Sequence, residues 1–156
     1  MFNGAFTGIL MGVLALLLIV AAVIDVRTFT ISNRLNLTVA LLAPVYWFAA
    51  QLGQGHIILQ VSAAVVVFLL FAGAFYAGLM GGGDVKLAAA LALWFPPYAT
   101  IKLMVWMSVA GGVLTLAVVG WHRFKQRPGR PEIPYGVAIA FGGLLILTQR
   151  FLNQFA

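Results

Sequence analysis

Long apolar runs alternate with short polar segments along this chain of 156 residues. A helix needs about 20 mostly apolar residues to cross a bilayer core of ~30 Å. Six runs fit helices, over residues 5–24, 35–50, 57–80, 85–95, 101–121 and 135–151. The pattern therefore predicts an all-α, polytopic membrane protein of about six transmembrane helices, with residues 1–156 forming a single transmembrane domain.

Composition supports the same class of protein. The chain is 63% hydrophobic and only 8% charged, whereas soluble domains carry about 25% charged residues. Too few ionic groups are present to coat a soluble surface, so lipid must contact most of it. The first apolar run has no Lys or Arg before it and is longer than the core of a signal peptide, which predicts a retained helix.

The basic residues predict the orientation in the membrane. The net charge is +6. If all six helices cross the membrane, the segments that contain most of the basic residues lie on the same membrane face. These basic residues are Arg27, Arg34, Lys86, Arg123, Lys125, Arg127 and Arg130, with only Lys102 and Arg150 on the other face. The positive-inside rule makes the first face cytoplasmic and both termini external. This distribution favours anionic lipid headgroups as partners over nucleic acid.

The run at residues 85–95 is the shortest of the six. Eleven residues make a helix of about 17 Å, which is less than the bilayer core. If this run did not cross, the basic cluster at 123–130 would lie opposite Arg27 and Arg34, against the positive-inside rule. We therefore expect a short spanning helix, with local thinning of the bilayer.

The chain has only three acidic residues, Asp25, Asp84 and Glu132. Glu132 lies in the basic segment 121–134 and is interpreted as a solvated charge. Asp25 and Asp84 each end a long apolar run at the same predicted membrane edge, where ionisable side chains are costly and mark function. The alternative is that each anchors locally to Arg27 or Lys86. Residues two apart on a helix do not face each other, which argues against such pairs within a helix, although pairing in a turn stays open.

Two carboxylates at one depth are suited to aspartyl protease chemistry. Like charges close together share a proton, so the ionised member can activate a water while the protonated member donates to the scissile carbonyl. Gly81, Gly82 and Gly83 precede Asp84, and a glycine run predicts that the helix before it ends or unwinds. A phosphate-binding loop is disfavoured because no Lys-Ser/Thr pair follows these glycines and no strand pattern precedes them.

Three motifs in order carry a family resemblance. Gly81-Gly82-Gly83-Asp84 is followed by Val85-Lys86, and Asp25 is followed at a distance by Ile31-Ser32-Asn33, where the family usually has Ile-Pro-Asn. The third is the segment 133–140 with Gly142-Gly143. The sequence resembles the type IV prepilin peptidases, the GxGD-type membrane aspartyl proteases, in the short CpaA/TadV-like branch that serves Flp/Tad-type pili. Because Ser is a good N-cap, Ser32 or Asn33 can still begin a helix.

The resemblance implies a six-helix enzyme of the bacterial cytoplasmic (inner) membrane. It would remove the leader peptide of type IV, Flp-like prepilins at the cytoplasmic face, with Asp25 and Asp84 as catalytic residues. Gly81, Gly83, Arg27, Asn33 and Lys86 would support them, Arg27 and Lys86 chiefly as snorkelling anchors, although tuning of the aspartates is the other possibility. Longer members carry a cysteine-containing insertion and N-methylate the product; this chain has no cysteine, so methyltransferase activity is not expected.

Other features are expected to be structural. His56 and His122 are predicted to lie in loops at opposite faces, too isolated for a metal site, and no cofactor is expected. The four tryptophans, Trp47, Trp94, Trp106 and Trp121, are interpreted as an interfacial belt. Two other classes stay open: a small proton-coupled transporter, and a non-catalytic membrane subunit of a pilus or secretion assembly. The pattern indicates neither an oligomeric state nor a particular pilin.

Overall fold

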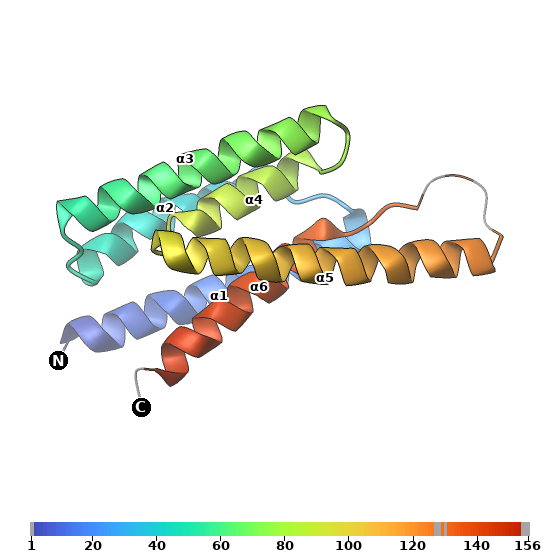
Figure 1. The fold of residues 1–156 in the computed structure, drawn as a ribbon. Helices are drawn as coiled ribbons and strands as arrows, with labels where there is room; N and C mark the ends of the chain where they lie inside the picture. The colour runs from blue at the N-terminus through green and yellow to red at the C-terminus, as the bar shows by residue number, and fades with distance from the viewer. Residues whose placement is uncertain (1, 127–128, 130, 154–156) are drawn as a thin grey trace.

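Six helices and no strand make up the described part of the chain, which comprises residues 2–126, 129 and 131–153 of the computed structural model (Figure 1). They are α1 Phe2–Thr28, α2 Asn33–Ala49, α3 Gln54–Tyr76, α4 Gly82–Ala92, α5 Pro97–Phe124 and α6 Tyr135–Leu152. The all-α prediction is confirmed. Four helices, α1, α3, α5 and α6, are long and apolar enough to cross a membrane. The crossing of α2 and α4 stays a prediction.

The helix boundaries around the two aspartates differ from the expected ones. α1 continues to Thr28, so Asp25 lies in its last turn. α3 ends at Tyr76 and α4 begins at Gly82, so Asp84 does not end the third helix but lies in the first turn of the fourth. Gly81 is the N-cap in extended backbone. Glycine costs little in a first turn, and a carboxylate there is favoured by the helix dipole.

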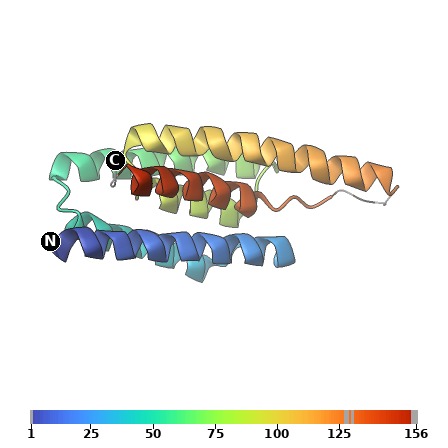
Figure 2. The ribbon, with the colours of Figure 1, turned by 90° about the horizontal axis from the view of Figure 1, so that it is seen from below.

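The connections α1–α2, α3–α4 and α5–α6 lie at one end of the bundle, and both termini lie at the other (Figures 1 and 2). α5 extends beyond the other helices at the end with the three connections. Because Asp25 is near the end of α1 and Asp84 near the start of α4, both residues belong to that end. Arg127 and Arg130, two residues of the predicted basic cluster, lie outside the described residues.

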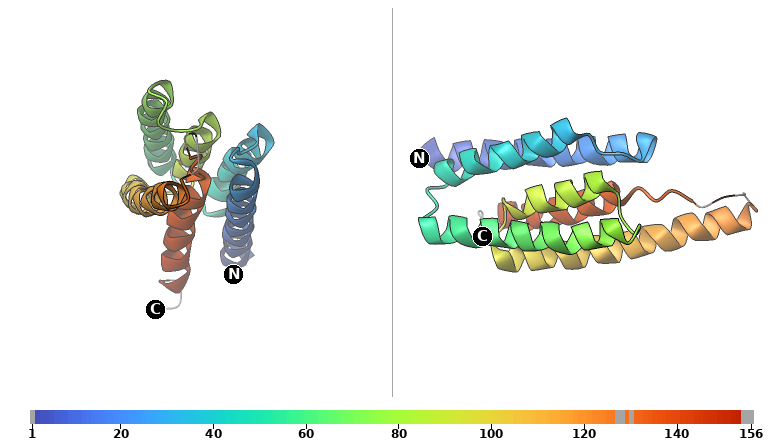
Figure 3. Two further views of the ribbon diagram at one scale, coloured as in Figure 1. Left: turned by 90° about the vertical axis from the view of Figure 1, so that its right-hand side faces the viewer. Right: turned by 90° about the horizontal axis from the view of Figure 1, so that it is seen from above.

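The short helix α4 occupies the middle of the bundle. It packs against α2, α3 and α6, and α6 packs in turn against α1 and α5; the end-on view in Figure 3 shows α3 and α5 on the outside. The largest fully buried side chains are Trp94 and Phe95, just after α4. Other fully buried side chains are Leu14 and Leu18 of α1, Leu87 and Leu91 of α4 and Ile139 of α6.

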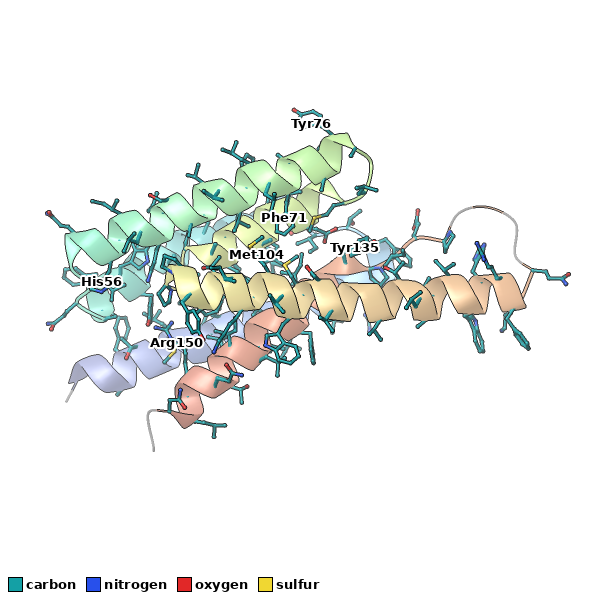
Figure 4. The ribbon with its side chains drawn as sticks, in the orientation of Figure 1. His56, Phe71, Tyr76, Met104, Tyr135 and Arg150 are labelled. Atoms are coloured by element: carbon teal, nitrogen blue, oxygen red, sulfur yellow. The ribbon has the colours of Figure 1, made fainter. Side chains whose placement is uncertain are left out.

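The C-terminal end of α4 is closed by side chains of neighbouring helices. Trp47 Nε1 donates to the Leu93 carbonyl at 2.8 Å, and Arg150 donates to the Trp94 carbonyl at 3.2 Å (Figure 4). Trp94 Nε1 donates to the Val39 carbonyl of α2 at 2.9 Å. Helix ends in a membrane need such partners. Trp94 is 1% exposed, so its assignment to an interfacial belt is wrong.

Candidate active site

Asp25 is held between the end of α1 and the start of α6. Its side chain is 2% exposed, and the backbone N–H groups of Gly136 and Val137 donate toward its carboxylate. The N-cap residue of α6, Pro134, makes no side-chain capping bond of its own. Asp25 therefore serves the first amides of α6 as a cap supplied by another helix, and the positive end of that helix dipole faces its carboxylate.

Asp84 enters the same site from the first turn of α4. It is 8% exposed, and the backbone N–H of Gly81 donates toward its carboxylate. The carboxylates of Asp25 and Asp84 are close enough to repel each other electrostatically. Asp25 Oδ2 and Asp84 Oδ1 are buried and have no hydrogen-bond partner among the described residues. Buried polar atoms are normally paired, so these two oxygens remain available to a ligand.

Three glycines allow the elements to approach each other closely at this point. A Cβ at Gly136 would lie 2.8 Å from Asp25 Oδ2 and 2.6 Å from Ile31 Cδ1. A Cβ at Gly83 would lie 2.8 Å from the Ile31 carbonyl oxygen, and one at Gly81 would lie 2.8 Å from Asp84 Oδ2. Real Cβ atoms do not approach so closely, so a larger residue at any of these positions would displace the site.

Ile31 lies at the centre of this packing, although the sequence assigned it no role. Phe29 ends α1 with a positive φ of 52°, a conformation that is rare for a bulky residue. The resulting turn buries Ile31 against Gly83 and Gly136. Ser32 then caps α2, accepting a hydrogen bond from the Leu35 amide at 3.3 Å, which confirms the predicted helix start. The sequence assigned Gly136 no separate role either. Its signal was its position in the segment 133–140, the third motif of the family resemblance.

The predicted supporting residues form links between α2 and α4. Lys86 Nζ donates to Asn33 Oδ1 at 2.7 Å, so its hydrogen-bond partner is Asn33. Asn36 Nδ2 donates to the Gly83 carbonyl at 2.9 Å. Asn36 was missed, and the signal for it was a single amide side chain inside the apolar run 35–50. Arg27 is exposed near the same end of the bundle, as is Glu132, in line with its interpretation as a solvated charge.

The two histidines are placed differently from the prediction. His56 lies in the first turn of α3 and His122 in the last turn of α5, rather than in loops. His122 Nε2 lies 3.0 Å from the Gly129 carbonyl oxygen, and His56 lies at the opposite end of the bundle (Figure 4). Within the described residues, no group of three His, Cys, Asp or Glu side chains could hold a metal ion.

The fold and the placement of Asp25 and Asp84 define a class of protein: a helical membrane protein with an interacting pair of buried carboxylates at one end of its bundle. The model of the type IV leader peptidase family matches residues 12–116, which include both aspartates. The match covers more than half of the chain, so the chain belongs to this family of prepilin-peptidase-type proteases, and a prepilin is the substrate that membership implies. No curated protein and no solved structure matches the chain.

Proposed function

We propose that this protein is an aspartyl endopeptidase that removes the leader peptide of type IV, Flp-like prepilins at the cytoplasmic face of the bacterial inner membrane. Asp25 and Asp84 are the proposed catalytic residues. The observation that supports them is the pairing of two buried carboxylates, 59 positions apart in the chain, each with an unpartnered oxygen. Gly81, Gly83 and Gly136 hold the pair in place through backbone amides and close packing.

The proposed mechanism uses one shared proton. Two adjacent carboxylates cannot both ionise easily, so one is a base and the other an acid. The ionised carboxylate takes a proton from a water that attacks the scissile carbonyl carbon. The protonated carboxylate donates to the carbonyl oxygen, and the resulting tetrahedral intermediate collapses as a proton passes to the leaving amine. The two aspartates therefore act as one unit.

Leader removal by the purified protein in liposomes tests the proposal. Wild-type protein should cleave a type IV prepilin, and Asp25→Asn or Asp84→Asn alone should abolish nearly all cleavage. The double variant should be little worse, because effects within a catalytic unit are strongly non-additive. Glu132→Gln is the matched control and should stay active, since Glu132 is exposed.

Two outcomes would contradict the proposal. If either Asn variant kept most of its rate while thermal unfolding showed a normal fold, the two-aspartate mechanism would be wrong and a transporter role would become the better hypothesis. Loss of cleavage on chelation, with recovery on adding zinc, would indicate a metal-dependent enzyme instead.

We also propose that the protein is a peptidase alone and does not methylate its product. Transfer of a methyl group to the cleaved pilin would refute that part of the proposal.

A further inference from the structure

A groove of about 530 Å³ lies between α2, α3 and α4, beside the candidate active site. Its walls are apolar and include Leu37, Ala40, Val61, Val65, Phe68 and Leu93. Three polar residues, Asn33, Asn36 and Lys86, line it at the end that carries the first turn of α4. The groove therefore has an apolar body and a polar end next to the first turn of α4, which carries Asp84.

The wall residues on α2 and α3 are partly open to the surroundings of the bundle. Leu37 is 57% exposed and Val65 is 52% exposed. Both side chains are apolar, and α3 is long and apolar enough to cross a membrane. If α2 crosses beside it, as the predicted topology has it, the surroundings at this depth are the hydrocarbon region of the bilayer. An apolar chain segment already in the membrane could enter the groove sideways without crossing a polar surface.

Asn36 gives the groove a chemical preference. Its side chain lines the groove and is 4% exposed, and its Oδ1 has no hydrogen-bond partner among the described residues. Its Nδ2 is bonded to the carbonyl of Gly83, the residue directly before Asp84. A buried acceptor needs a donor. Lys86 lies at the same end and keeps ammonium protons beyond the one it donates to Asn33.

A peptide segment satisfies these groups better than a lipid does. Backbone N–H groups are donors for Asn36 Oδ1, and backbone carbonyls are acceptors for Lys86, whereas the acyl chain that a lipid would place in this apolar groove has neither. We propose that this groove binds an apolar, membrane-embedded segment of the substrate that lies beside the cleavage site, with Asn36 Oδ1 accepting a substrate backbone N–H. The inference rests on the proposed function, and it assigns the substrate a place on the α2–α3–α4 side of the bundle.

A second groove, of about 520 Å³, provides an internal comparison. It lies between α3, α5 and the start of α6, and Gly112 is among its lining residues. Two further lining residues, Phe71 and Tyr135, are labelled in Figure 4. The hydroxyl of Thr115, which lines this groove, donates to the Gly111 carbonyl at 2.7 Å and lies 3.4 Å from the Tyr135 hydroxyl. This groove matches the first in size and apolar character, but its lining has none of the buried unpartnered atoms found at Asn36.

Filling each groove in turn tests the assignment. Ala40→Leu adds three carbons to the first groove, and Gly112→Leu fills the second, where a Cβ meets nothing within 4 Å. With a membrane-embedded prepilin, Ala40→Leu should raise KM about tenfold or more, equivalent to at least about 1.4 kcal/mol, and leave kcat nearly unchanged. Gly112→Leu should alter neither constant.

A short soluble peptide that spans the cleavage site and lacks the apolar segment serves as the folding control. Both variants should cleave it at the wild-type rate. A raised KM for the prepilin in Gly112→Leu, with Ala40→Leu normal, would overturn the assignment and place the substrate in the second groove. Normal constants in both variants would also overturn it.

Crosslinking separates the docking site from the proposed chemistry. The chain has no cysteine, so Val65→Cys and Gly112→Cys can each be combined with Asp84→Asn and a prepilin that carries one cysteine in its apolar segment. Crosslinking at position 65 and not at 112 is the expected result. Crosslinking at 112, or at neither position, would refute the assignment; so would a photoreactive residue at 65 that labels only lipid. Failure of the wild-type protein to cleave would instead refute the proposed function and leave the crosslinking result valid.

Discussion

Helices α3 and α4 lie side by side and differ sharply in what surrounds them (Figure 1). α3 is a long apolar helix of 23 residues, yet only Gln60, Ala64 and Val67 are buried. α4 has 11 residues and contains glycine, alanine, lysine and aspartate, yet most of it is buried. Its buried residues are Asp84, Val85, Leu87, Ala88, Ala90, Leu91 and Ala92.

The difference follows from the nature of the solvent. Lipid tails are as apolar as leucine, so hydrophobicity does not drive one helix under another in a membrane. Small residues let helices approach closely, and polar groups need partners inside the bundle. α4 has both features, which places it in the centre beside α2, α3 and α6, while most of α3 is exposed on the outside of the bundle. In this protein a short helix rich in small residues, rather than a long apolar one, lies at the centre of the bundle.

The largest effect is expected where the central elements meet at Asp25. Gly136→Val would bring a side chain against Asp25 Oδ2 and Ile31, displacing the carboxylate by about an ångström. Such displacements cost on the order of 100-fold in rate. Initial rates of leader removal measure the loss. Gly112→Val on α5, where a Cβ meets nothing within 4 Å, is the matched control and should keep full activity. Equal rates for both variants would contradict the view that close packing at Gly136 positions Asp25.

A large effect on stability is expected further along α6, where Gly143 packs against α1 and α4. A Cβ at Gly143 of α6 would lie 2.8 Å from Leu18 Cδ1 and 3.4 Å from Leu91 Cδ1. Gly143→Val should therefore lower the free energy of unfolding by about 1–3 kcal/mol through overpacking. Thermal unfolding in detergent provides the measurement. Gly73→Val on α3 meets nothing within 4 Å, and a comparable loss of stability there would show that α3 is not peripheral.

A smaller effect is expected at the closed end of α4. Trp94→Phe keeps an aromatic ring but removes the hydrogen bond to the Val39 carbonyl, and a typical intramolecular hydrogen bond contributes about 0.5–1.5 kcal/mol to stability. Because the substitution also retains most of the apolar contact, the loss should fall near the lower limit. Trp106→Phe on α5, where the side chain is 39% exposed, is the control. Equal unfolding temperatures would argue that Trp94 contributes no more than a lipid-facing tryptophan.

The smallest effect is expected from single cysteines used to map orientation. Arg34→Cys and Lys125→Cys should be labelled from the cytoplasmic side, and Gly55→Cys from the outside, with little change in activity. All three positions are exposed. Arg34 and Lys125 belong to the end of the bundle that carries the α1–α2, α3–α4 and α5–α6 connections. Labelling of positions 34 and 125 from opposite sides would exclude the predicted topology and the crossing of α2 or α4.

Much of the local structure could be predicted from the sequence, because it depends on neighbours along the chain. The apolar runs predicted six helices, and Ser32 was recognised as a possible cap of α2. The glycine run marks the start of α4 rather than the end of α3, which ends earlier, at Tyr76. Asp25 and Asp84 were singled out because they are the acids at the ends of apolar runs. The predicted helix boundaries were wrong by a few residues in places; for example, α4 begins at Gly82 rather than at residue 85.

Only the tertiary structure decided which apolar surfaces are buried and what faces the aspartates. The amides of α6 that face Asp25, the position of Ile31 between Gly83 and Gly136, and the burial of Trp94 all join residues distant in the chain. In water, an apolar face would have indicated the buried side of each helix. In lipid, both sides of α3 are apolar and the pattern is uninformative, so close packing of small residues and the pairing of polar atoms select the arrangement.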